Sequence, residues 1–194
     1  MPKEPSVQKS IPEIITHNLI ITILKPEEFQ LLATYERENR THLARWEPLR
    51  DTAYFTDVEV AKRVRSNFED FILGSSAAFV GLDSSRSKII CVCNFSNIVH
   101  GAFQACHLGY SINAGDQGKG LMFEMLNACI EYMFLDRGLH RIMANYIPAN
   151  IRSEKLLTKL GFEKEGLAKS YLKIAGLWQD HVLTSKINPS HIGL

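Results

Sequence analysis

The stretch LGYSINAGDQGKGLMFEMLNACIEYMF spans residues 108–134. Its composition predicts a strand, a short glycine-rich loop and a long, largely apolar helix. Gly115, Gly118 and Gly120 fall within six residues of the loop, and glycine lets backbone amides approach a ligand with no Cβ in the way. The first amides of the following helix have no intrahelical partner. Loop and helix start together therefore predict an anion site, most often one for phosphate.

The spacing of this loop differs from that of two common phosphate-binding loops. A Walker A loop would place Ser or Thr after its lysine, whereas Gly120 follows Lys119 here. The Rossmann spacing G-x-G-x-x-G is reversed to G-x-x-G-x-G, and the strands expected before the loop form an antiparallel meander. Judged from the loop alone, the alternative that its glycines serve only to make a tight turn remains open.

The rest of the chain alternates between helix and strand patterns, which predicts an α+β fold with a mixed sheet. A strand, a crossover helix and a strand after the loop imply one parallel pair. Pro48 makes the segment 39–50 irregular, because the residue before a proline avoids the α region. The expected strands are 17–24, 77–82, 88–96, 102–112, 140–146, 167–174 and 180–187, and the expected helices are 26–39, 57–74, 119–136 and 150–160.

Length and composition favour one domain. The chain has 194 residues and a net charge of +1, which fits a single core and gives no sign of a bulk nucleic-acid or membrane surface. Residues 1–12 are expected to form a disordered tail and 13–194 the domain. We also expect no signal peptide or membrane span, no metal, and a cytoplasmic location, because the four cysteines lack metal-ligand spacing and fit buried free thiols.

Two motifs resemble those of the GNAT superfamily of N-acetyltransferases. The loop 117–122 is similar to the pyrophosphate motif [Q/R]-x-x-G-x-[G/A], and the run N-x-x-S-x-x-L-x-x-K-x-G-F over 150–162 is similar to the second motif. A narrower resemblance, to the RimJ/RimL family, covers almost the whole chain. It is carried by the segments 38–48, 94–97, 108–112, 117–124, 140–146, 160–166 and 178–184.

The resemblance implies a GNAT-type α/β/α fold with a mostly antiparallel sheet of about seven strands, splayed at an acetyl-CoA site. It further implies direct transfer of acetyl from acetyl-CoA to the N-terminal alanine of a small-subunit ribosomal protein, as the RimJ type does. Two departures matter. Met122 stands where the general motif has Gly or Ala, and Leu157 stands where many GNAT enzymes carry a tyrosine that protonates the thiolate, so that acid is not carried over.

The donor site that the resemblance implies combines the loop with the two diverging strands. Loop amides and Lys119 would bind pyrophosphate, and the strand 108–112 would offer backbone groups to the pantetheine and the acetyl carbonyl. Asn150 would bind pantetheine or cap a helix, a role that Asn favours. The expected donor residues are Tyr110, Ser111, Ile112, Gln117, Gly118, Lys119, Gly120, Leu121, Met122, Asn150 and Ser153.

The acceptor must be a neutral amine, and an α-amino group with a pKa near 7.7–8.0 needs little help to become one. We hypothesise Glu47 as the base and Ser153 as the acid. His107 is a second candidate base, and a structural role remains the alternative for each. Trp46 could equally belong to the core. The expected acceptor-side residues are Asn39, Arg40, Trp46, Asn94, Ser96 and Tyr146.

Two rival functions stay open. One is a GNAT enzyme that acts on another peptide or on a small amine. A small polycationic amine would need an acidic groove, whereas the segment 39–50 sets Arg40, Arg45 and Arg50 against Glu47. The second rival function is that of a non-catalytic factor that binds CoA or assists ribosome assembly. The partner we expect is a ribosomal-protein N-terminus, met on assembling ribosomes, without membrane or direct nucleic-acid binding.

Overall fold

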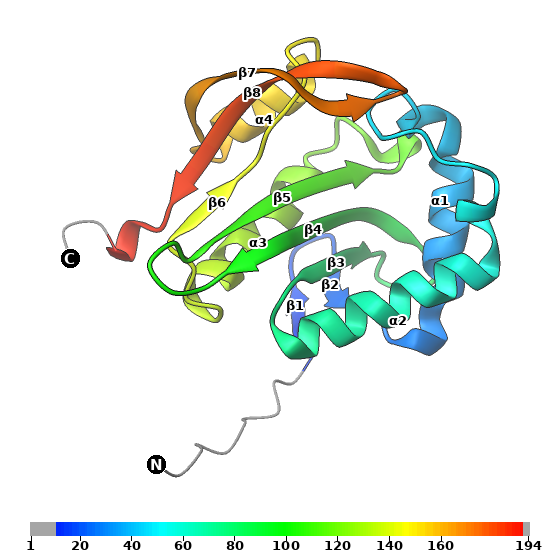
Figure 1. The fold of residues 1–194 in the computed structure, drawn as a ribbon. Helices are drawn as coiled ribbons and strands as arrows, with labels where there is room; N and C mark the ends of the chain where they lie inside the picture. Colours follow the sequence, from blue (N-terminus) through cyan, green and yellow to red (C-terminus); the bar gives the residue numbers. More distant parts are fainter. Residues whose placement is uncertain (1–10, 192–194) are drawn as a thin grey trace.

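A computed structural model describes residues 11–191. Most of the expected tail, residues 1–10, lies outside the described part. The fold is built on one eight-stranded sheet in the order β1-β2-β3-β4-β5-β6-β8-β7 (Figure 1). The strands are β1 Glu13–Ile15, β2 Ile20–Ile23, β3 Ala77–Leu82, β4 Ile89–Val99, β5 Ala105–Ile112, β6 Arg141–Met143, β7 Glu163–Ile174 and β8 Leu177–Ile187.

The sheet is antiparallel except between β5 and β6. This parallel pair is connected by α3 (Leu121–Leu135), as the crossover pattern predicts. Pairing begins with Ala105 opposite Arg141 and ends with His107 opposite Met143. Beyond that point the β5 segment 108–112 continues to pair with β4 alone. The expected splay between the two strands is therefore present.

Helices cover both faces of the sheet. The helices α1 (Phe29–Leu43) and α2 (Asp57–Leu73) pack on β2 to β4 through a small core that includes Val60, Val64 and Val80. A larger core lies against α3 and α4 (Ile151–Lys159), and Figure 1 shows α3 behind the sheet. As predicted, α3 is apolar on most sides. Its buried residues are Met122, Met125, Leu126, Cys129, Ile130, Met133 and Phe134.

Several boundaries differ from the sequence-based expectation. The α1 helix continues to Leu43, so the irregular segment begins at residue 44 rather than 39. The expected strand 140–146 shortens to β6, although Tyr146 forms an isolated bridge with Val182. The short strand β1 was not expected and brings the strand count to eight. All four cysteines are free and buried, as predicted.

The hairpin of β7 and β8 is longer than expected and forms one edge of the sheet (Figure 1). Its turn lies at Ala175 and Gly176, which both have a positive φ. The Ala175 amide donates a 2.9 Å hydrogen bond to the Glu47 carbonyl. The hairpin therefore fixes the segment 44–50 over the splayed strands.

Within residues 11–191, no helix combines the length and apolarity needed to cross a membrane.

Candidate functional site

Two cavities meet where β5 leaves β6. The first, which we call the loop cavity, has a volume of about 740 Å³ and is lined by the glycine loop, the first turn of α3 and one side of α4 along its length. The second, the groove cavity, has a volume of about 730 Å³ and runs between α1, the segment 44–50 and β3 to β5. Seven residues line both cavities: Leu43, Trp46, Glu47, Tyr110, Ser111, Asn150 and Ser153.

The loop has the backbone geometry of an anion cradle. Gly118 and Gly120 adopt φ values of +76° and +81°, and a Cβ built on either would meet no atom within 4 Å. Glycine is therefore required here by the left-handed backbone and not by crowding from the protein. Gly120 is also the N-cap of α3, so the positive end of the helix dipole faces the loop cavity.

The side chains of the loop cavity favour an anionic ligand. Arg45, Arg152, Lys155 and Lys159 line it, and Glu47 at the junction is the one carboxylate among its described lining residues. The Arg152 guanidinium also hydrogen-bonds the Gln117 side chain. The sequence reasoning missed these α4 cations, although the spacing of 152, 155 and 159 places them on one helix face.

Lys119 forms an ion pair within the loop. Its ammonium pairs with Asp116 at 2.7 Å, is more than half exposed, and lines neither cavity. The hydrogen bonds from Lys119 and Asn113 lower the pKa of the Asp116 carboxyl. The lysine charge is therefore paired within the loop, and its expected contact with the ligand stays a prediction.

At the start of α4, Asn150 and Ser153 carry the second motif. The Asn150 side-chain oxygen accepts the Ser153 amide at 3.2 Å and so caps the helix. Both side chains nevertheless line the two cavities. The Ser153 hydroxyl hydrogen-bonds the Tyr110 hydroxyl at 2.5 Å. Burial raises the pKa of Tyr110 to about 12, so this phenol stays protonated at neutral pH.

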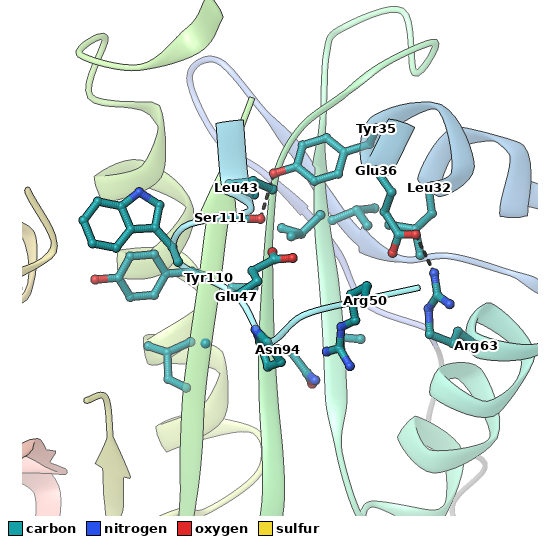
Figure 2. Close-up of a pocket in the computed structure, with 18 of the residues that line it drawn as sticks. Leu32, Tyr35, Glu36, Leu43, Glu47, Arg50, Arg63, Asn94, Tyr110 and Ser111 are labelled. Carbon is teal, nitrogen blue, oxygen red and sulfur yellow. Dashed lines mark hydrogen bonds and ion pairs between the residues drawn. The ribbon is translucent and has the colours of Figure 1, made fainter. Parts of the chain in front are cut away.

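Glu47 lies at the centre of the junction. Figure 2 shows its carboxylate in the groove, between Tyr110 and Ser111 on one side and Arg50 on the other. Partial burial raises the pKa of the Glu47 carboxyl, and the positive charge of Arg50 opposes that shift. A carboxylate with a raised pKa is a stronger proton acceptor than an exposed one.

The inner part of the groove holds residues that the sequence reasoning missed. The Tyr35 hydroxyl hydrogen-bonds the Ser111 hydroxyl at 2.8 Å, and burial raises the pKa of Tyr35. The Glu36 carboxylate forms an ion pair with Arg63, which is drawn as a dashed line in Figure 2. These side chains come from α1 and α2, far in sequence from the loop, and no local motif marks them.

Of the expected acceptor-side residues, four line the groove cavity: Arg40, Trp46, Asn94 and Tyr146. Trp46 is only half-buried and lines both cavities, so the alternative that it belongs to the core is wrong. Leu157, in contrast, is a core residue with 1% exposure.

Besides Lys119, three expected residues lie away from the two cavities. Asn39 is 1% exposed, donates to the Tyr35 carbonyl and accepts from the Ala114 amide, so it holds α1 to the loop. Ser96 faces His107 across the β4–β5 pair, and neither lines a cavity. The acceptor contacts expected of Asn39 and Ser96, and the base expected of His107, therefore lie outside the two cavities and stay predictions.

No cluster of three or more His, Cys, Asp or Glu side chains that could hold a metal ion occurs among residues 11–191.

Comparison with known proteins gives a consistent result. The chain is 46% identical over 185 residues to the [Ribosomal protein uS5]-alanine N-acetyltransferase of Escherichia coli (strain K12), covering 94% of this chain and 95% of that protein. The crystal structure of the ribosomal-protein-S5-alanine acetyltransferase from Vibrio fischeri has a TM-score of 0.88 and 42% identity, covering 92% and 97% of the two chains.

A more distant solved structure, Mycobacterium smegmatis RimJ in complex with CoA-disulfide, has a TM-score of 0.83 at 22% identity. It covers 98% of this chain and 92% of its own, and it confirms the fold. Residues 18–163 match the family described as "Acetyltransferase (GNAT) domain". The chain belongs to the GNAT acetyltransferase family, as the two motifs indicate.

Proposed function

We propose that this protein transfers acetyl from acetyl-CoA to the N-terminal α-amino group of a small-subunit ribosomal protein that begins with alanine. The observation that carries the proposal is the meeting of a cationic loop cavity and a separate groove at Glu47, Tyr110 and Ser153. Two reactants that enter from opposite sides would meet at these residues. Holding both in one site is the main requirement of a direct transfer.

The loop cavity fits the donor. Amides of 117–122 and the start of α3 would hold the pyrophosphate, and Arg152 and Lys155 would add positive charge. The β5 segment 108–112, which is unpaired on its β6 side, would offer backbone groups to the pantetheine arm. When bound, acetyl-CoA supplies an activated acyl group with a thiolate as the leaving group.

Glu47 and Ser153 are the residues that would move the proton. Glu47 would accept the proton of the attacking amine, directly or through water. The Ser153 hydroxyl, held by the Tyr110 hydroxyl, would deliver a proton to the thiolate; water would then return a proton to Ser153 and take one from Glu47, which restores both residues. An α-amino group with a pKa near 7.7–8.0 is uncharged in a fraction of about a tenth or more at neutral pH, so a single weak base is sufficient.

The choice of acceptor rests on similarity along nearly the whole chain to the uS5-alanine N-acetyltransferase. We further propose that the acceptor is met in the cytoplasm, on assembling ribosomes. The rival small polycationic acceptor is disfavoured by Arg40 and Arg50 in the groove cavity. A purely CoA-binding role would leave the junction of the two cavities without a use.

The test is turnover with acetyl-CoA and matched peptides that begin with Ala, Ser or Met, followed by thiol release and peptide mass. We expect acetylation of the Ala peptide at the α-amine, and little with spermidine. Thiol release with spermidine alone would favour the small-amine alternative. Binding of acetyl-CoA without release for any amine would favour the binding factor.

A further inference from the structure

Two arginines on the wall of the groove cavity have no carboxylate partner. Arg40 comes from α1 and Arg50 from the segment 44–50, and both line the groove cavity and not the loop cavity. Among residues 11–191, neither guanidinium forms an ion pair or donates a side-chain hydrogen bond. Their ten N–H donors, five on each guanidinium, therefore stay available to a ligand.

The two guanidinium groups are oriented by aromatic rings. Arg40 lies 4.5 Å from the ring centroid of Phe55, and Arg50 lies 4.5 Å from that of Tyr54. The two rings are neighbours with centroids 5.1 Å apart. A cation–π contact fixes the plane of a guanidinium without neutralising its charge. We call Arg40 and Arg50, with these rings, the arginine wall.

The other charged groups of the groove do not cancel this wall. Arg63 is neutralised by its ion pair with Glu36. Glu47 is the remaining carboxylate of the described lining, and it lies at the junction with the loop cavity, where the acceptor amine must arrive. The groove therefore combines a negative group at the reacting end with positive groups further along, as Figure 2 shows for Glu47 and Arg50.

We propose that the arginine wall binds an acidic side chain within the first few residues of the acceptor, after its reactive amine. The inference rests on the proposed peptide acceptor and goes beyond it by naming a second feature that the acceptor must carry. An extended peptide advances about 3.3–3.6 Å per residue, so a chain whose amine lies at Glu47 passes the wall with its next residues. Guanidinium groups match carboxylates with paired hydrogen bonds.

The experiment compares peptides that begin with alanine and carry Glu or the isosteric Gln at one position from the second to the fifth. For the wild type we expect kcat/KM to be about tenfold higher with Glu than with Gln at one or two positions, mainly through KM, because hydrogen bonds to a charged group are stronger than those to a neutral one. In Arg50→Gln, and more fully in Arg40→Gln/Arg50→Gln, this Glu/Gln ratio should fall to about one.

The ratio separates recognition from other effects of Arg50. Loss of Arg50 also changes the pKa of Glu47, but that change affects both peptides equally and cancels. Arg65→Gln is the matched control, because Arg65 is an exposed α2 residue that lines neither cavity. This variant should keep both its activity and the Glu/Gln ratio of kcat/KM. In Arg50→Glu, a Lys peptide should become the better substrate.

A wild-type ratio near one at every position would overturn the inference while leaving peptide acetylation intact. So would a ratio that survives in the Arg40→Gln/Arg50→Gln variant. No turnover of any peptide by the wild type would instead overturn the proposed function. Thermal unfolding of each variant shows whether a lost ratio reflects a changed groove or a misfolded protein.

Discussion

At the scale of single residues, Glu47 combines position with a perturbed acidity. Partial burial raises the pKa of its carboxyl above the usual value, so the carboxyl is protonated at a higher pH than an exposed one. If Glu47 is the base, kcat/KM should rise with pH through this raised pKa, and rise further as the acceptor amine loses its proton near 7.7–8.0.

Glu47→Gln should remove the limb of the pH profile at low pH and lower kcat by at least about 10²-fold. Its effect on stability has the opposite sign. Because the folded pKa is raised, ionising Glu47 costs stability, and that cost grows as pH rises from the unfolded through the folded pKa. Chemical denaturation at pH 7 should show Glu47→Gln to be as stable as the wild type or more so. A kcat within twofold of the wild type would exclude Glu47 as the base.

Ser153 and Tyr110 should behave as one unit, because their hydroxyls hydrogen-bond each other at the junction of the cavities. Ser153→Ala should lower kcat about 10²-fold, as expected for loss of a positioned acid. Tyr110→Phe should lower it less, and the double variant should be no worse than Ser153→Ala. Steady-state kcat of the four proteins tests this cycle. Losses that multiply would show that the two hydroxyls act independently.

The residues that could be predicted from the sequence are those in local motifs. The glycine loop, Asn150 and Ser153 follow from spacing, and Glu47 follows from its irregular segment. Tyr35 and Arg63 come from α1 and α2, whose groove-facing side chains form no recognised motif, so spacing alone does not reveal them. The position of Asn39 could not be predicted, because tertiary packing decides which side of α1 faces the groove. That packing buries the Asn39 side chain against the loop.

At the scale of elements, the turn of the β7–β8 hairpin controls the segment that carries Glu47. Ala175 donates to the Glu47 carbonyl, and a Cβ on Gly176 would lie 2.8 Å from the Leu49 side chain. The hairpin and the segment 44–50 therefore position each other, although they are far apart in sequence.

Gly176→Ala should disturb this arrangement. Gly176 has φ +82°, and a left-handed backbone costs a residue with a Cβ about 1–2 kcal/mol. The Leu49 side chain is exposed and can turn away from the new Cβ, so strain in the turn that holds the Glu47 carbonyl is what should shift the segment and raise the acceptor KM. Gly74→Ala is the control, because Gly74 has φ +83° with no atom within 4 Å of the built Cβ and lies at the end of α2. Gly74→Ala should lose a similar amount of stability and keep its acceptor KM. If Gly176→Ala also keeps its acceptor KM, the turn does not control the segment.

Element prediction worked best where burial produces a clear pattern. The apolar helix α3 and the meander β3 to β5 agree with their expected ranges within a few residues. The β7–β8 hairpin was underestimated because most of β7 is exposed on both faces, so hydrophobic alternation does not mark its start. The three-residue β1 is too short for any periodicity to indicate it.

At the scale of the whole molecule, the sheet consists of two parts joined by few pairs. Strands β1 to β5 form one part and β6, β8 and β7 the other, with three register pairs between β5 and β6. The splay that this short pairing leaves open is lined by Tyr110 of β5 and by Ser153 of α4, the helix that connects β6 to β7. A donor in the splay would therefore contact both parts and stabilise the fold as a unit.

Acetyl-CoA at about 100 times its Kd should stabilise the folded protein by about 2.7 kcal/mol, which corresponds to a rise in Tm of roughly 5–11 °C for a chain of this size. Gly118→Val should abolish the rise, because a β-branched residue disfavours the left-handed backbone that presents the loop amides.

Gly101→Val is the matched control: Gly101 has φ +75°, has equally open space, and lies in the β4–β5 turn. Without ligand, the Tm of Gly101→Val should fall about as much as that of Gly118→Val, yet acetyl-CoA should still raise the Tm of Gly101→Val. Differential scanning fluorimetry with and without acetyl-CoA measures both effects, and an equal ligand-induced rise in the two variants would show that the loop does not bind the donor.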